Sequence, residues 1–129
     1  MPIERVGTGS AWEARNGYSR AVRAGDWVLL TGTAAFAPDG SVVSPGEAGA
    51  QTERCYAIIA GALAQLGLGL EHVVRSRIFL TDMSQADAVG RVHKQLLGAN
   101  KPCLTLVGCP ALVHPDLVVE IECEAWAGE

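Results

Sequence analysis

The stretch VVRSRIFL, residues Val73–Leu80, decides the fold class of this chain because polar and apolar residues alternate along it. One side of the repeat carries Val74, Ser76, Ile78 and Leu80. The other side carries Arg75, Arg77 and Phe79. A period of two is typical of a β-strand whose two faces meet different surroundings. The sequence therefore predicts a strand with one face toward a core and a mixed face that bears two arginines.

The segments on both sides of this strand have the period of an α-helix. From Gly46 to Leu66, one helical face carries Cys55, Ile58, Ile59, Ala62, Leu63 and Leu66. Gly67 fits the position just after that helix. A second helix is predicted to open at Ser84, with Asp87 completing a capping box, and to close at Gly98. Its apolar face carries Ala88, Val89, Val92, Leu96 and Leu97.

Further strands are predicted before and after the helices. Trp27–Thr31 is a short apolar run, and the turn Pro38-Asp39-Gly40 leads from it toward Val42-Val43, which suggests an antiparallel meander. Leu104–Cys109 is an apolar strand, and Leu117–Trp126 is the last strand. The core-facing residues of the last strand are Leu117, Val119, Ile121, Cys123 and Ala125, and its opposite face carries Glu120, Glu122 and Glu124.

The order β-β-α-β-α-β-β predicts an α/β (α+β) fold in which a mixed sheet carries both helices on one face. The other face of the sheet lacks helices. Phe79, Val118 and Trp126 are predicted to lie there beside arginines and glutamates. Because such a mixed surface is commonly covered by another subunit, we expect the chain to form a homo-oligomer.

Composition narrows the classes of protein. The chain has 129 residues, 49% of them hydrophobic, which suits a single domain over 1–129. A net charge of −4 without a basic stripe argues against nucleic acid as a partner. No apolar run has the length of a signal sequence or a membrane span, so we expect a cytoplasmic protein with no membrane partner. Four cysteines without a C-x-x-C pair predict no metal site, and most are expected to be buried thiols.

Several short segments, in this order and spacing, resemble the reactive intermediate deaminase (Rid, or YjgF-type) family along nearly the whole chain. They are Gly17-Tyr18-Ser19-Arg20-Ala21-Val22, Leu30-Thr31-Gly32-Thr33, Ala50-Gln51-Thr52, Val73-Val74-Arg75, Phe79-Leu80-Thr81-Asp82-Met83, Lys101-Pro102 and Val119-Glu120-Ile121-Glu122. The resemblance implies a chorismate-mutase-like fold, a homotrimer and three clefts, each between two neighbouring chains. We expect no cofactor, because no phosphate-cradling glycine loop can be assembled from the sequence.

The family's chemistry is the hydrolysis of enamines and imines to ketones and ammonia. The resemblance implies that Glu120 positions the water, and that Tyr18 and the segment containing Gly32 and Thr33 line the substrate pocket. In the family an arginine holds the substrate carboxylate. The matching segment here is Pro102-Cys103-Leu104-Thr105, so Leu104 stands where that arginine is expected, with Cys103 before it.

This departure leaves two functions open. The first is a deaminase with an altered carboxylate clamp, similar to the family branches that lack the arginine. The second is a non-catalytic small-molecule-binding trimer in which Leu104 makes the cleft more apolar. A further departure is Gly90, where many relatives carry Asn. RNA cleavage, a label on some relatives, fits the acidic balance of this chain least well.

The candidate site residues also have structural interpretations. Glu120 is predicted to act as a general base in a partly dry interface, yet Glu122 and Glu124 share its parity and indicate a solvated strand face. Arg77 is predicted either to bind an anionic substrate or to pair with these glutamates across strands. Cys103 is a nucleophile only where a nearby base or cation lowers the pKa of its thiol.

Overall fold

The computed structural model describes residues 2–128, and within them one six-stranded sheet has the order β1-β2-β3-β6-β4-β5. Its strands are β1 (Ile3–Val6), β2 (Ala21–Ala24), β3 (Trp27–Ala34), β4 (Val73–Leu80), β5 (Cys103–Gly108) and β6 (Val119–Trp126). The helices are α1 (Ala11–Asn16), α2 (Ala48–Ala64) and α3 (Ala86–Leu97). The pair β4–β5 is parallel and the other neighbours are antiparallel, so the predicted mixed sheet is confirmed.

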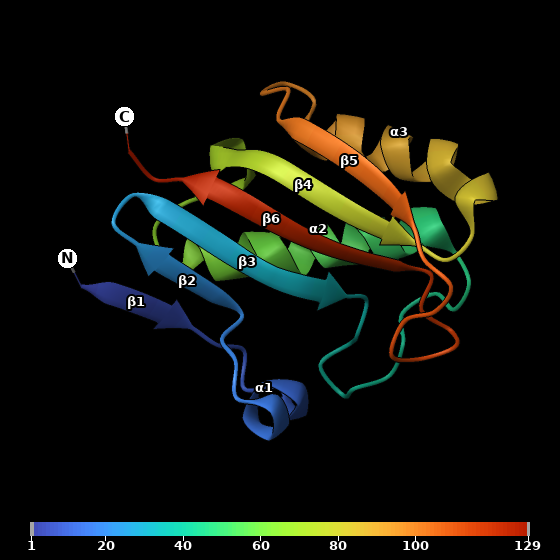
Figure 1. The fold of residues 1–129 in the computed structure, drawn as a ribbon, viewed down its shortest axis with the longest axis horizontal. Helices are drawn as coiled ribbons and strands as arrows, with labels where there is room; N and C mark the ends of the chain where they lie inside the picture. Colours follow the sequence, from blue (N-terminus) through green and yellow to red (C-terminus); the bar gives the residue numbers. More distant parts are fainter. Residues whose placement is uncertain (1, 129) are drawn as a thin grey trace.

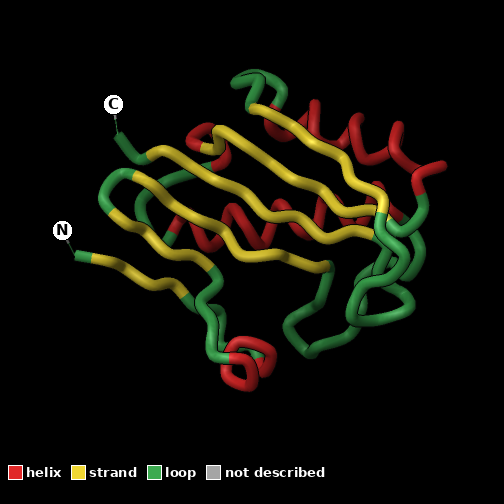
Figure 2. The backbone as a smooth tube through the Cα atoms, viewed as in Figure 1, coloured by secondary structure: helices red, strands yellow, loops and turns green. Residues whose placement is uncertain are grey.

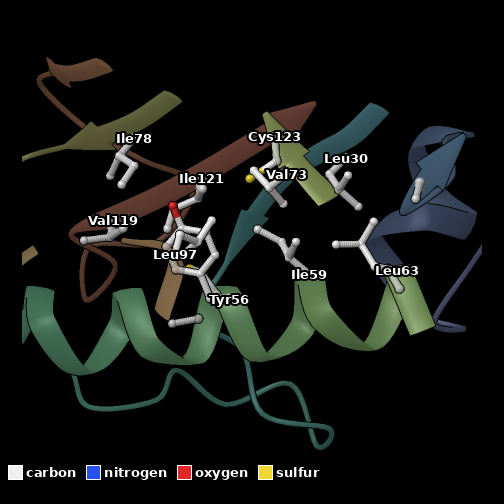
Figure 3. Close-up of a cluster of buried hydrophobic side chains, with 14 of the residues drawn as sticks. Leu30, Tyr56, Ile59, Leu63, Val73, Ile78, Leu97, Val119, Ile121 and Cys123 are labelled. Atoms are coloured by element: carbon white, nitrogen blue, oxygen red, sulfur yellow. The ribbon is translucent and has the colours of Figure 1, made fainter. Parts of the chain in front are cut away.

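Helices α2 and α3 cover the same face of the sheet, as the sequence predicted (Figures 1 and 2). Tyr56, Ile59 and Leu63 of α2 point toward the sheet, where Ile121 and Cys123 of β6 meet them (Figure 3). The alternation predicted for β6 is confirmed, because its odd-numbered residues from 119 to 125 are buried and its even-numbered ones are not. Burial of these side chains is the main favourable contribution to folding.

The predicted alternation of buried and exposed residues in β4 is wrong at the start of the strand. Val73 is buried and Val74 is exposed, because the pairing with β6 shifts by one residue between Val73 and Arg75. A β-bulge of this kind moves a side chain to the opposite face. From Ser76 to Leu80 the predicted alternation holds.

The N-terminal third departs most from the prediction. The elements β1, α1 and β2 were not predicted. The predicted strand at Val42-Val43 is reduced to one bridge between Phe36 and Val42. The carbonyl of Val43 instead accepts a hydrogen bond from Gln51 Nε2 at 3.2 Å. The backbone of this loop is therefore satisfied by a buried side chain and needs no long strand partner.

Other boundaries move by a few residues. The capping box at Ser84 and Asp87 is not formed; Asp82 Oδ1 accepts from Ser84 N at 3.1 Å, a short 3₁₀ turn follows, and α3 begins at Ala86. Gly67 has a φ of 74°, as expected for a residue that follows a helix. Val118 precedes β6 and packs against the core rather than on the uncovered face.

Two further expectations concern cysteines and membranes. Cys55 and Cys123 are buried, whereas Cys103 is exposed and Cys109 is partly exposed, so burial holds for half of the thiols. Among residues 2–128, no helix has the length and apolar character that a membrane span requires.

His93 of α3 generates the first prediction. Its side chain is buried near the ring of Tyr56, its Nε2 has no hydrogen-bond partner within residues 2–128, and burial lowers its pKa below 6.5. The unfolded chain therefore binds this proton more tightly, and the free energy of unfolding is expected to fall as the pH drops below 6.5. Urea denaturation at pH 7.5 and 5.5 measures this decrease, which should shrink in His93→Gln. His114→Gln, at a half-exposed histidine, should keep the decrease of the parent; an equal decrease in all three proteins would contradict the assignment.

Candidate active site

A cleft of about 730 Å³ lies beside the end of β3, between the segment that contains α1, the loop after β3 and the middle of α2. Figure 1 shows α1 and the loop after β3 on the same side of the molecule, and the rings of Trp12 and Phe36 lie 6.2 Å apart there. Tyr18, Gly32 and Glu120, which were predicted as site residues, all line this cleft. The structure thus brings together three residues that are far apart in sequence.

Glu120 lies over Gly32. Its strand position is opposite Ala34 of β3, and a β-bulge between Leu30 and Thr33 sets the register there. A Cβ atom at residue 32 would be 2.5 Å from Glu120 Oε2, so a glycine is required for the carboxylate to occupy this place. Burial raises the pKa of Glu120 above 4.5; the positive charge of Arg20 opposes the rise, and Glu122 adds to it. The solvated-face interpretation therefore does not describe Glu120, which is a partly desolvated carboxylate at a cleft wall.

Arg20 forms the base of the cleft and was not among the predicted site residues. Its Nη1 donates to the carbonyl of Gly32 at 3.1 Å and to Thr33 Oγ1 at 3.3 Å, and its Nη2 donates to Tyr18 Oη at 3.4 Å. The side chain is buried. Arg20 therefore fixes the backbone under Glu120 and orients the phenol of Tyr18.

Glu13 of α1 is the counter-ion of Arg20, with Oε2 3.5 Å from Nη2. It also accepts from Thr8 N at 3.0 Å, from Thr8 Oγ1 and from Ser10 Oγ at 2.8 Å. Burial alone would raise the pKa of Glu13, but the hydrogen bonds from Thr8 and Ser10 and the charge of Arg20 outweigh burial and lower it. A sequence signal did exist, because Ser10 and Glu13 have the spacing of a capping box, and Ser10 caps α1.

Arg54 contributes a second positive charge to the cleft and was not among the predicted site residues. It lies on the side of α2 that faces the loop after β3, and its Nε donates to the carbonyl of Phe36 at 3.0 Å. Ile58, one turn further along α2, lines the same cleft. This wall therefore combines a cation with apolar surface.

The remaining predicted site residues lie outside the cleft of a single chain. Thr33 is buried beneath it, with Oγ1 donating to the carbonyl of Thr31 at 2.8 Å. Cys103 and Leu104 belong to β5, at the far edge of the sheet. Arg77 forms an ion pair with Glu122, which is the structural alternative considered for it. A substrate contact by Arg77, Cys103 or Leu104 stays a prediction.

Residues 8–127 match the protein family described as endoribonuclease L-PSP, which comprises the YjgF and Rid proteins. The chain belongs to the YjgF/Rid family. It is 38% identical over 126 residues to an uncharacterised protein of Streptomyces coelicolor, covering 98% of this chain and 93% of that protein. It is 25% identical over 126 residues to a RutC family protein of Pyrococcus abyssi, covering 98% of each.

A solved YjgF/Rid structure supports the same assignment. The crystal structure of a YjgF/YER057c/UK114 family member from Mycobacterium tuberculosis superposes with a TM-score of 0.87 at 40% identity, covering 97% of this chain and 99% of that one. Membership in the YjgF/Rid family supports a role in processing a small molecule. Within residues 2–128, His, Cys, Asp and Glu side chains form no group of three placed to hold a metal ion.

The ion pair between Glu13 and Arg20 generates the second prediction. Glu13→Gln removes the counter-ion of a buried arginine whose Nε already lacks a partner within the described chain. The free energy of unfolding is expected to fall by about 1.5–3 kcal/mol at pH 7, because hydrogen bonds to charged groups are worth that much. Urea denaturation measures the change, with Glu53→Gln on the exposed side of α2 as the control. Equal stability of Glu13→Gln and the parent would show that Arg20 does not need this carboxylate.

Proposed function

We propose that the protein is a Rid-like hydrolase that converts a small enamine or imine to a carbonyl compound and ammonia. The cleft beside Gly32 is the proposed reaction site, and Glu120 is the proposed general base. The observation that carries the proposal is the Glu120 carboxylate, partly desolvated and placed against a residue without a side chain. Membership in the YjgF/Rid family supports the reaction class.

The proposed reaction needs one carboxylate and one water molecule. Glu120 accepts a proton from water while the water oxygen forms a bond to the imine carbon, and the protonated Glu120 then gives that proton to the imine nitrogen. The resulting carbinolamine loses its C–N bond, a C=O bond forms, and ammonia leaves after the second proton transfer. A base whose pKa is raised toward the working pH exchanges protons with substrate in both directions more readily than an ordinary carboxylate does.

The surroundings of Glu120 suit this chemistry. Arg20 lies close enough to oppose the rise in the pKa of Glu120, but its Nη donors are used by Gly32, Thr33 and Tyr18. The positive charge of Arg20 therefore acts on the Glu120 carboxylate, although the two side chains form no hydrogen-bonded ion pair. Its oxygens stay available for water and substrate.

We propose that each working cleft lies between two subunits of a homotrimer. In one chain, β4 separates β5 from β6, so Leu104 and Glu120 occupy different parts of the sheet. The side of the sheet that carries no helix exposes Trp27, Leu29 and Trp126. Burial of this apolar surface would favour association, and a second copy would be needed to bring β5 to the cleft.

The second candidate function is a non-catalytic binding protein. The observation that favours it is Leu104, an exposed apolar residue at the position where the family resemblance implies an arginine. A protein of this kind would bind a small molecule in the cleft and release it unchanged. The two candidates differ in turnover rather than in binding.

The third prediction distinguishes the hydrolase from the binding protein by measuring turnover. Imines are generated in the assay by an amino-acid oxidase, 2-aminomuconate is supplied as a second substrate, and ammonia release is followed. The parent should accelerate release, and Glu120→Gln should lose at least 100-fold of that acceleration because it cannot accept a proton. Leu104→Arg tests the altered clamp in the same assay.

Two controls guard this result. Sedimentation equilibrium should give a trimer mass for the parent and for Glu120→Gln, so that lost turnover is not lost assembly; a monomer mass for the parent would refute the intersubunit cleft. Gly32→Ala should also lower turnover while its melting temperature stays close to that of the parent, because the new Cβ displaces the flexible end of Glu120. Undiminished turnover in Glu120→Gln would remove its proposed role, and activity found only in Leu104→Arg would favour the binding protein.

A further inference from the structure

Arg54 is the cation of the cleft whose hydrogen-bonding groups are least used. Only its Nε has a protein acceptor within residues 2–128, the carbonyl of Phe36 at 3.0 Å. In the same part of the chain, no carboxylate oxygen comes within 4.0 Å of its guanidinium nitrogens. Four N–H groups on the two Nη atoms remain for another acceptor.

The single bond to Phe36 orients this arginine. A guanidinium group is planar, so a bond at Nε fixes the plane in which the Nη donors lie. Helix α2 supplies a rigid backbone for the residue, and the loop after β3 supplies the acceptor. The side chain is only partly exposed. Its donors are therefore partly preorganised, which lowers the entropy lost when a ligand binds.

Two other charged residues of the cleft, Arg20 and Asp39, already have partners. Arg20 is paired with Glu13 and bonded to Gly32 and Thr33. Asp39 accepts from Ser41 N at 2.9 Å and from Ser41 Oγ at 2.6 Å within its own turn. Glu120 is the remaining acidic residue that lines the cleft, and it has no ion pair within the described residues. Arg54 and Glu120 are thus the two charges that a ligand would meet.

We propose that Arg54, on α2, binds the carboxylate of the ligand and makes this cleft prefer a carboxylate over a neutral analogue of the same shape. This inference rests on the proposed function, because it assigns the carboxylate-binding residue of the same site. Paired N–H···O bonds from an arginine fork to a carboxylate are directional and charge-assisted. Ile58 and Phe36 line the same wall and would contact the carbon chain of such a ligand.

This assignment moves the carboxylate-binding charge from the sheet to a helix. Leu104 of β5 has no charge to offer, whereas Arg54 belongs to the same chain as Glu120 and lines the same cleft. The carboxylate of the ligand would be held at the α2 wall, and its reacting carbon would lie toward Glu120. The cleft could then still bind anionic ligands, although position 104 carries leucine in place of the family arginine.

The test compares binding of 4-methyl-2-oxopentanoate with binding of its neutral amide, by calorimetric titration of the full chain. The parent should bind the carboxylate about tenfold more tightly than the amide or better, as expected for a charge-assisted hydrogen bond. Arg54→Gln should lower affinity for the carboxylate to that for the amide and leave affinity for the amide unchanged. Arg54→Lys should keep part of the preference, because it retains the charge without the fork.

Arg91→Gln, an exposed arginine of α3, is the matched control and should bind both probes as the parent does. Melting temperatures of the Arg54 variants show whether they remain folded, and the amide affinity shows whether the cleft is intact. An unchanged carboxylate preference in Arg54→Gln, or no preference in the parent, would overturn the assignment. If Glu120→Gln loses turnover while Arg54→Gln keeps the carboxylate preference, the proposed hydrolysis is supported and this inference fails. If Glu120→Gln keeps turnover while Arg54→Gln loses the preference, this inference is supported and the proposed role of Glu120 fails.

Discussion

The packing of β6 between β3 and β4, and against α2, is the constraint on which the rest of the structure depends. Ile121 and Cys123 of β6 face the helix and are buried with Tyr56 and Ile59 of α2. Because side chains alternate along a strand, burial of these residues forces Glu120 and Glu122 onto the opposite side. The same alternation that builds the core therefore presents the carboxylates. A one-residue slip of β6 would exchange core and charge together.

Two local features make Glu120 different from the other glutamates of its strand. The bulge of β3 places Gly32 beside it, and the absence of a Cβ there gives the carboxylate room. Glu122 instead forms an ion pair with Arg77. Burial then raises the pKa of Glu120, while Arg20 limits the rise. The position and the raised pKa of Glu120 therefore depend on the neighbouring strand β3 as much as on the glutamate itself.

Much of the fold was predictable because β4, β6 and the two long helices have clear periods. The core positions of β6 and the helix-covered face followed directly from those periods. The order of the strands in space, the bulges and the short N-terminal elements did not, since they depend on pairing over long distances. Val74 shows the limit: its place in the sequence repeat predicted burial, and one shift in pairing exposed it.

The candidate site was predictable only in part. Glu120, Gly32 and Tyr18 came from family segments, and the structure places all three at one cleft. Arg54 could not be found this way, because a single arginine on a helix has no distinguishing period, and its meaning depends on the loop carbonyl of Phe36. The role of Arg20 depends on its ion pair with Glu13, which the structure shows and the sequence does not. Electrostatic roles are set by three-dimensional neighbours, which spacing alone does not specify.

The central claim is that Glu120 is a partly desolvated carboxylate whose pKa is raised. The most direct measurement is a carbon-13 NMR titration of the glutamate side-chain carboxyl groups in the folded protein, with the Glu120 signal assigned by its disappearance in Glu120→Gln. We expect a pKa for Glu120 above 4.5, the ordinary value for glutamate. A pKa at or below 4.5 would mean that the carboxylate is solvated or ion-paired, and would contradict the proposed role of Glu120.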